Sequence, residues 1–406
     1  MGLGQAALSG YDAGMRSRIN FSSFLLATMV ATAQAQAPFV DPSRDAGYLG
    51  SPDNILFWTP EQQVAGYRNM ERLVPVRKVQ AGDHPLVLPE KPLDLGPVEL
   101  AGQSGGMNIE QYLEQQSVAG LLVIKNGAIV YERYRLGNNR HSLWLSYSVT
   151  KSVTSMLVGA AIQDGYIKSV DEPVTDYLPR LKGTAYDKVS IRDILQMASG
   201  VEWNETYSDP EADINQVTWE TLSLYDYLAA KPASGKPGIN FNYNTAETNL
   251  VGTLLRSAIG NNLSTYLEQK IWQPFGMEAD ASWNLTEPGG GEFGGCCLNA
   301  SLRDYGRLGL FALNNGQLPR GERVLPEGWM HESITPSKGS SRYGYLWWLG
   351  KNGVFEASGI FGQGILVNPQ ENLVIAIQSA RPDASKEEDW ALQSELYKAI
   401  AGALRE

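Results

Sequence analysis

The chain has 406 residues, of which 43% are hydrophobic and 19% charged, and its formal net charge is −11. That length allows a large core in one or two domains. The acidic balance, without a Lys/Arg cluster, argues against nucleic acid as a partner, because a DNA or RNA binder needs a basic face.

The first 35 residues have the pattern of a cleaved export signal. After Met15, two arginines precede an apolar run over 24–30, and the small-x-small motif Ala33-Gln34-Ala35 follows. We therefore expect a start at Met15, cleavage after Ala35, and a periplasmic or secreted product with no stable membrane insertion after cleavage. The alternative for residues 1–35 is a membrane anchor or a disordered arm.

Residues 36–406 are expected to form a single unit that begins with a Pro-rich approach segment. Residues 57–73 predict a short helix behind a Thr-Pro start. Residues 76–96 hold too much proline and charge for a core and are expected to wrap the surface. Two β-rich runs within 120–134 flank Asn126-Gly127, which is the strongest short signal for a hairpin.

The middle and the end of the chain differ in pattern. Residues 165–330 predict mainly helices and loops, with helices closed by Gly200 and Gly260. Residues 343–403 predict strands, including a hairpin that turns at Asn368-Pro369.

A last amphipathic helix is expected over 385–403, where Leu392, Leu396 and Ile400 have helical spacing. Strands at both ends with helices between them predict an α+β sandwich. In it, the N- and C-terminal segments form one antiparallel sheet, and the helical region is an insert.

The two cysteines, Cys296 and Cys297, are adjacent, so the chain has no disulfide framework. Adjacent cysteines can bond only through a strained ring, and we expect two buried thiols. No CxxC or Cys/His spacing indicates a metal site, and we expect neither a metal nor another cofactor.

Few histidine bases are available, since the chain contains only His84, His141 and His331. The segment Gly102-Gln103-Ser104-Gly105-Gly106 matches the nucleophile-elbow pattern. That motif requires a buried strand before it, and the preceding segment does not have the pattern of one. We interpret the segment around Ser104 as a flexible loop.

Ser148 and Lys151 are a stronger candidate pair. A spacing of three places both side chains on one face of a helix, about one turn apart. Burial by the apolar run that follows would lower the lysine pKa, and a neutral Lys151 could then take the Ser148 proton. The alternative is an N-cap serine with a lysine that snorkels to solvent.

Two further residues complete a pattern. Tyr243 stands at the expected start of another helix, and Gly359 on a C-terminal strand. Ser148-x-x-Lys151, Tyr243-Asn244-Thr245 and Ala357-Ser358-Gly359 together resemble the S-x-x-K, Y-x-N and K-T-G elements of serine β-lactamase-related hydrolases, the class C and penicillin-binding-protein group. The flanks "NETYSDP", "GGCCLNASLRDYGRLG" and "GIFGQ" resemble its 6-aminohexanoate-dimer (nylon oligomer) hydrolase branch.

The resemblance implies a β-lactamase-like fold and a serine acyl-enzyme. Ser148 would attack an acyl carbonyl, Lys151 and Tyr243 would carry the proton, and the backbone N–H groups of Ser148 and Ile360 would form the oxyanion hole. Tyr207 matches a tyrosine that contacts the substrate amide in the nylon-oligomer branch, or is a packed loop aromatic.

Gly359 would allow close approach of the substrate. Trp347 and Trp348 could line the cleft, although at least one of them is expected in the core. Two positions depart from β-lactamases, because Ala357 replaces the K-T-G lysine and Thr245 replaces the Y-x-N asparagine.

Both departures disfavour antibiotic hydrolysis. We expect an exported serine hydrolase whose substrate is a small-molecule amide that resembles linear 6-aminohexanoate oligomers. The alternatives are a carboxylesterase on the same fold and a ligand-binding protein without catalysis. The sequence leaves the natural substrate and the oligomeric state open.

Overall fold

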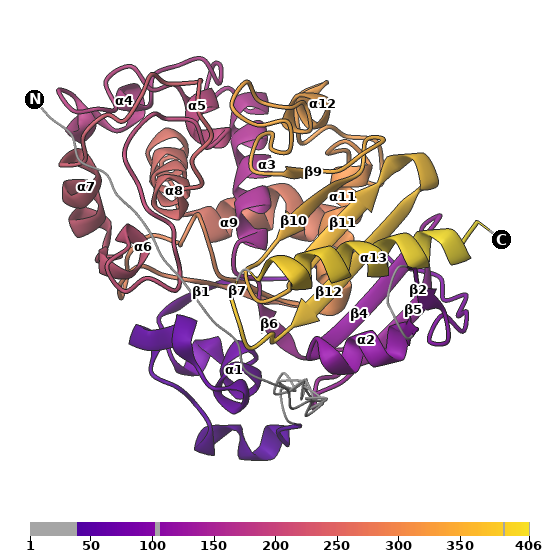
Figure 1. Ribbon diagram of the computed structural model, residues 1–406. Helices are drawn as coiled ribbons and strands as arrows, with labels where there is room; N and C mark the ends of the chain where they lie inside the picture. The colour runs from indigo at the N-terminus through magenta and orange to yellow at the C-terminus, as the bar shows by residue number, and fades with distance from the viewer. Residues whose placement is uncertain (1–38, 102–105, 385, 406) are drawn as a thin grey trace, which may run out of the picture. The chain divides into compact units, whose positions relative to one another are not determined.

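In the computed structural model, which describes residues 39–101, 106–384 and 386–405, the main sheet draws its strands from both ends of the chain (Figure 1). All neighbouring strands are antiparallel. Asn126 and Gly127 join the first two strands with φ values of 51° and 75°, as a tight hairpin turn requires. The predicted sheet and hairpin are confirmed. The strand order is β5 (Ala128–Tyr134), β4 (Val118–Lys125), β12 (Leu373–Ser379), β11 (Gly364–Asn368), β10 (Phe355–Ser358) and β9 (Trp348–Leu349).

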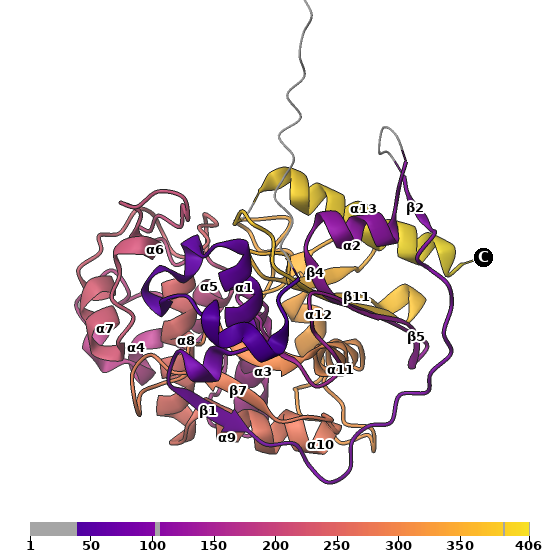
Figure 2. The same ribbon diagram turned by 90° about the horizontal axis from the view of Figure 1, so that it is seen from below.

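Helices cover both faces of this sheet (Figures 1 and 2). Alternate residues of β4 point to opposite faces, so that Leu121 packs with α2 (Ile109–Gln115) and α13 (Glu387–Ala403), whereas Leu122 packs with α11 (Leu302–Leu313). The predicted C-terminal helix is confirmed, and its Leu392, Leu396 and Ile400 are buried in the first of these layers. The result is a helix–sheet–helix sandwich.

A second, four-stranded sheet was not expected. Its order is β1 (Val76–Val79), β7 (Ala281–Asn284), β8 (Leu298–Ser301) and β6 (Leu143–Leu145). Residues 76–79 therefore form a strand that pairs with β7, and only the rest of the 76–96 segment is a surface loop. Likewise, the region 165–330 contains two strands besides its helices. A short ladder joins β2 (Glu99–Leu100) and β3 (Met107–Asn108).

The helical region packs around α3 (Val149–Gln163) and α8 (Thr245–Ile259), which lie against each other. Gly260 ends α8 with a φ of 65°, as predicted, but α5 ends before Gly200, at Leu195. The other helices are α1 (Pro60–Tyr67), α4 (Val174–Tyr177), α5 (Ile191–Leu195), α6 (Asp213–Gln216), α7 (Thr221–Ala229), α9 (Leu263–Leu267), α10 (Gln273–Phe275) and α12 (Trp329–Ser333).

Short 3-10 and π segments link these elements. The 3-10 segments are η1 (Pro42–Gly47), η2 (Pro52–Phe57), η3 (Met70–Arg72), η4 (Pro179–Leu181) and η6 (Pro369–Glu371), and η5 (Glu268–Trp272) is a π-helical turn.

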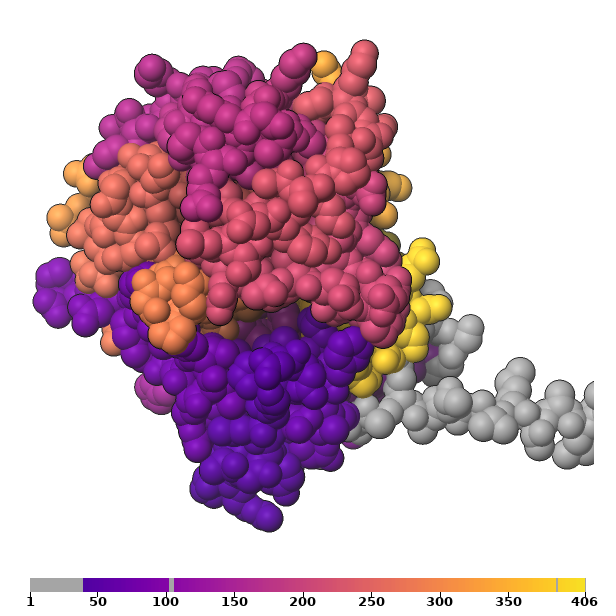
Figure 3. Space-filling model, turned by 90° about the vertical axis from the view of Figure 1, so that its left-hand side faces the viewer, coloured from indigo at the N-terminus to yellow at the C-terminus, as the bar shows by residue number. Residues whose placement is uncertain are grey.

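The N-terminal part, residues 39–74, packs against the turn that precedes α3, where Tyr67 contacts Tyr147. The Thr59 side chain caps α1 at Pro60, as the Thr-Pro pair predicts, but α1 ends at Tyr67, which is shorter than expected. Trp58 and Tyr67 belong to an apolar cluster with Tyr147 and Ile360. Figure 3 shows that the surface is hollowed between this N-terminal part, in indigo, and the helical region, in magenta and red.

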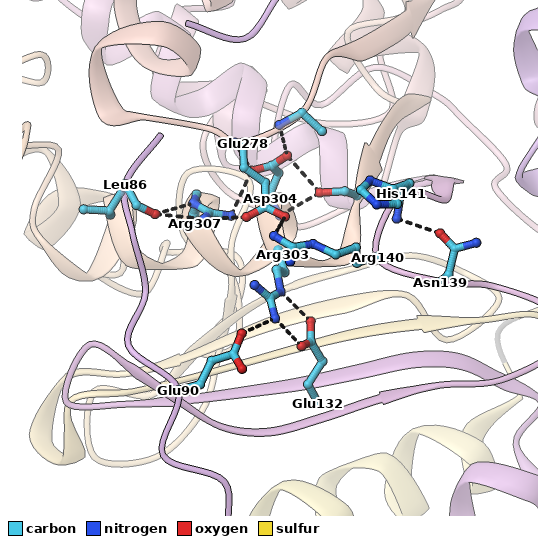
Figure 4. A network of polar contacts seen from close by, with 12 residues as sticks. Leu86, Glu90, Glu132, Asn139, Arg140, His141, Glu278, Arg303, Asp304 and Arg307 are labelled. Carbon is cyan, nitrogen blue, oxygen red and sulfur yellow. Dashed lines mark hydrogen bonds and ion pairs between the residues drawn. The ribbon is translucent and has the colours of Figure 1, made fainter. Parts of the chain in front are cut away.

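Two buried arginines form hydrogen bonds with the loop that follows β1 (Figure 4). Arg303 of α11 donates hydrogen bonds to Glu132 on β5 and to Glu90, and the buried Arg307 donates to Glu278 and to the Leu86 carbonyl. Because both arginines stand on one helix, this network fixes the loop against α11 and the sheet.

Within the described ranges, no helix has both the length and the apolar character needed to cross a membrane. The expected signal segment 1–35, the start at Met15, the cut after Ala35 and the loop at Ser104 lie outside the described residues.

Candidate active site

A sharp turn between β6 and α3 places Ser148 at the helix start. Tyr147 adopts a φ of 45°, a conformation that is costly for a residue with a side chain. Its ring packs against Tyr67 at 5.3 Å and Phe361 at 5.0 Å between centroids, and these contacts hold the turn. Ser148 occupies the N-cap position, yet its side chain makes no capping hydrogen bond. The hydroxyl is therefore free for another partner.

That partner is Lys151, whose Nζ lies 3.0 Å from Ser148 Oγ. Lys151 is only 1% exposed, so the alternative of a snorkelling lysine is wrong. Burial lowers the Lys151 pKa to about 7, against the opposing effect of the Glu205 carboxylate. A lysine with such a pKa is neutral in a large fraction of molecules near neutral pH and can accept a proton.

The carbonyl of Gly295 holds the other side of the lysine, with Lys151 Nζ at 2.7 Å from the oxygen. This segment threads between α3 and α8, since Thr154 of α3 donates to the Gly294 carbonyl and the Gly295 N–H donates to Asn249 of α8. A Cβ at Gly295 would lie 2.8 Å from the Thr245 carbonyl, so only glycine fits here. The two helices thus hold the Gly295 carbonyl in place beside the Lys151 amine.

Cys296 and Cys297 follow directly, and a disulfide joins them. The expectation of two buried thiols is therefore wrong; Cys296 is also only partly buried. A φ of 85° at Cys297 turns the chain at the pair and lets the two Sγ atoms meet.

Tyr243 precedes α8 and faces the same pair. The Lys151 Nζ lies 5.1 Å from the centre of the Tyr243 ring. Burial raises the Tyr243 pKa, and hydrogen bonding with Ser148 opposes that rise. Its phenol is therefore protonated at neutral pH and can give a proton to a leaving group. The structure brings Ser148, Lys151 and Tyr243 together, as the sequence predicts.

The expected oxyanion donors are the backbone N–H groups of Ser148 and Ile360. In the part of the chain that the structure describes, neither N–H takes part in a turn, loop or cap hydrogen bond. Gly359 precedes Ile360, and a Cβ there would lie 2.7 Å from the Ser146 carbonyl. Gly359 therefore allows a close approach to the chain just before Ser148, and its expected role in substrate approach stays a prediction.

The two tryptophans have different surroundings. Trp347 is 1% exposed and packs edge-on against Phe355, so its ring offers no surface to a ligand, contrary to the expectation of a substrate contact. Trp348 is partly exposed and stacks on Tyr243, with ring centroids 5.8 Å apart and an interplanar angle of 17°. Trp348 is thus the tryptophan that lines the Tyr243 side of the site.

Tyr207 lies between two apolar clusters, packing with the one that contains Ile360 and with the one that contains α8. Its hydroxyl donates a hydrogen bond of 2.8 Å to Glu205. Glu205 was not among the residues singled out from the sequence. The signal was present, because Glu205 stands two residues before Tyr207 within "NETYSDP".

Glu205 also bonds to the residue that replaces the Y-x-N asparagine. It accepts hydrogen bonds from the Thr245 N–H, at 3.1 Å, and from the Thr245 hydroxyl. At the K-T-G position, Ala357 is buried on β10 and brings no cation to the site. The three histidines are all exposed. The described residues hold no group of three or more His, Cys, Asp and Glu side chains that could bind a metal ion.

Comparisons with known proteins identify relatives of this chain. A family model described as β-lactamase matches residues 107–398. The 6-aminohexanoate-dimer hydrolase of Paenarthrobacter ureafaciens is 28% identical over 322 residues, which cover 73% of this chain and 81% of the relative.

Solved structures share the fold. A candidate 6-aminohexanoate-dimer hydrolase from Bacillus anthracis superposes with a TM-score of 0.76 at 24% identity, covering 85% of this chain and 95% of that one. A family VIII carboxylesterase gives a TM-score of 0.54 at 17% identity, covering 70% of this chain and 93% of its own.

Proposed function

The chain belongs to the β-lactamase family, and from this premise we propose that it is an exported serine hydrolase that cleaves linear amides through an acyl-enzyme on Ser148. The observation that carries the proposal is the 3.0 Å contact between Lys151 Nζ and Ser148 Oγ, made by a lysine that is 1% exposed. A serine hydroxyl is an activated nucleophile when a buried, neutral amine lies beside it and can accept its proton.

The proposed reaction has two stages. As Ser148 Oγ attacks the acyl carbonyl, its proton moves to Lys151, and the N–H groups of Ser148 and Ile360 bind the oxyanion. Tyr243 then donates its proton to the leaving amine as the C–N bond breaks, and the Lys151 ammonium can reprotonate the tyrosine. Water attacks the acyl-enzyme with the same groups acting in reverse, which releases the acid and restores Ser148.

The substrate class rests on two observations. The hydrolase of P. ureafaciens, named for 6-aminohexanoate dimer, aligns with 73% of this chain. Ala357 and Thr245 lack the cation and the amide group that β-lactamases use in the corresponding elements. We therefore expect linear amides to be better substrates than β-lactams.

A substrate panel tests this proposal. Purified protein is assayed with 6-aminohexanoate dimer, 4-nitrophenyl butyrate and nitrocefin, with Ser148→Ala as the control. The expected result is Ser148-dependent cleavage of the linear amide and little hydrolysis of nitrocefin. Turnover of the ester alone would indicate a carboxylesterase, and no turnover of any substrate would indicate a binding protein.

A further inference from the structure

The peptide group between Gly294 and Gly295 is held by one side chain from each of two helices. Its carbonyl, that of Gly294, accepts a hydrogen bond of 2.6 Å from the Thr154 hydroxyl on α3. Its N–H, that of Gly295, donates a hydrogen bond of 3.1 Å to Asn249 Oδ1 on α8. Both side chains are buried. The plane of this peptide is therefore fixed at both of its polar ends.

The next carbonyl along the chain, that of Gly295, contacts the candidate base. Its oxygen lies 2.7 Å from Lys151 Nζ, which in turn lies 3.0 Å from Ser148 Oγ. A glycine places few restraints on its own backbone rotation, so the direction of this carbonyl depends on how the preceding peptide is held. Hydrogen bonds thus connect Asn249 to the attacking oxygen through the Gly295 backbone and the lysine.

The Gly295 carbonyl sets the direction of the neutral Lys151 amine. A carbonyl oxygen can only accept, so the contact at 2.7 Å uses one of the two amine N–H groups. With that N–H committed, the nitrogen lone pair is available to the Ser148 hydroxyl proton. A displaced carbonyl would let the amine rotate about its Cε–Nζ bond, and the lone pair would no longer be held toward Ser148. Proton transfer to a general base depends on that geometry.

Asn249 contributes only the accepting half of its side chain to this arrangement. Its Oδ1 accepts from the Gly295 N–H, whereas Nδ2 is buried and has no hydrogen-bond partner in the part of the chain that the structure describes. An apolar side chain of the same size would avoid that unpaired amino group, which costs free energy. The acceptor is therefore what an asparagine supplies at this position.

We propose that Asn249, together with Thr154, is a positioning residue for the general base: by holding the Gly294–Gly295 peptide, it aims the Gly295 carbonyl at Lys151 and keeps the lysine lone pair facing Ser148. This inference rests on the proposed function, since it assumes that Lys151 takes the Ser148 proton.

Three substitutions separate the acceptor from the shape of the side chain. Asn249→Leu has a similar size but no acceptor. Asn249→Asp keeps an oxygen at the acceptor position and loses only the unpaired amino group. Thr154→Val removes the hydroxyl that holds the other end of the peptide. All three leave Glu205 and Tyr243 in place, whose charge and ring act on the lysine.

The rate at which a fluorophosphonate labels Ser148, measured between about pH 5 and pH 9, reports on this base. Ser148 Oγ displaces fluoride from phosphorus as Lys151 takes the proton, so the test does not depend on the natural substrate. For Asn249→Leu and for Thr154→Val, the plateau rate should fall about 10- to 100-fold, as expected for a misplaced catalytic group. The double variant should lose less than the product of the two single losses, because both side chains act through one peptide.

The position of the acid limb separates positioning from a general loosening of the fold. A carbonyl oxygen stabilises an ammonium more than an amine, so its displacement in Asn249→Leu should move the limb to lower pH by about 0.5 to 1 unit. Water that reached Lys151 through a loosened fold would instead raise the lysine pKa and move the limb to higher pH. Asn249→Asp should keep the plateau rate within a few fold of wild type.

Thr253→Val is the matched control. It removes a hydroxyl one turn further along α8, which donates to the Asn249 backbone carbonyl, and it should leave the rate and the limb unchanged. The inference is overturned by a limb that stays in place or moves to higher pH in folded Asn249→Leu, or by an Asn249→Asp no faster than Asn249→Leu. If Asn249→Leu does not fold, the limb of Thr154→Val decides by the same criterion. A wild-type protein that forms no Ser148 adduct would instead overturn the proposed function.

Discussion

Lys151 is predicted to control both the acid limb of activity and part of the pH dependence of folding. Burial lowers its pKa from 10.5 to about 7. Because a general base must be neutral, kcat/KM should fall about tenfold per pH unit well below that value. At pH 5.5 the protein should keep roughly 3% of its plateau activity.

The same shift gives a signed prediction for stability. Between pH 7 and 10.5 the unfolded chain binds a proton at this lysine that the folded chain binds only weakly, so the free energy of unfolding rises with pH. With these pKa values, the contribution of Lys151 grows by on the order of 2 kcal/mol between pH 7 and pH 9. Lys151→Met removes this contribution and leaves the other titrating groups in place.

Urea unfolding of the wild type and Lys151→Met at the two pH values measures the effect. The wild type should gain about 2 kcal/mol relative to the variant on going from pH 7 to pH 9. A difference between the two proteins that does not change with pH, together with an acid limb well below pH 6, would refute the neutral lysine.

Further outcomes test the proton relay and export. Tyr243→Phe should lower turnover by about 10²- to 10⁴-fold with little change in melting temperature, and activity within a few fold of wild type would reassign the relay. Ser148→Ala and Lys151→Ala should each abolish most turnover, and the double variant should be little worse than either, whereas additive losses would indicate independent roles. Amino-terminal sequencing of the exported protein should begin at residue 36, and a mature chain that still carries Arg16 would refute cleavage after Ala35.

Local signals in the sequence predicted the parts of the fold that local chemistry determines. Asn126-Gly127 defined a hairpin because both residues tolerate positive φ, and Thr59 marked the start of α1. The second sheet was missed because its strands have only three or four residues each, and their pairing joins β1 with β7, which lies far along the chain. No short window of sequence contains both partners.

The candidate site, like the fold, was predicted only where the interacting residues are close in the sequence. Ser148 and Lys151 lie one turn apart on one helix, so their spacing was sufficient to predict the contact. Trp347 and Trp348 are adjacent and have different surroundings, and the sequence did not determine which one is buried. Glu205 was missed because Thr245, which supplies two of its four donors, is 40 residues away.

Covalent labelling of Ser148 tests the central claim most directly. The protein is treated with a fluorophosphonate and digested, and the modified peptide is identified by mass spectrometry, with Ser148→Ala as the control. The account predicts one adduct, on Ser148, whose rate of formation rises with pH through about 7 as Lys151 loses its proton. An active protein that forms no adduct on Ser148, or a folded Ser148→Ala that still hydrolyses substrate, would contradict it.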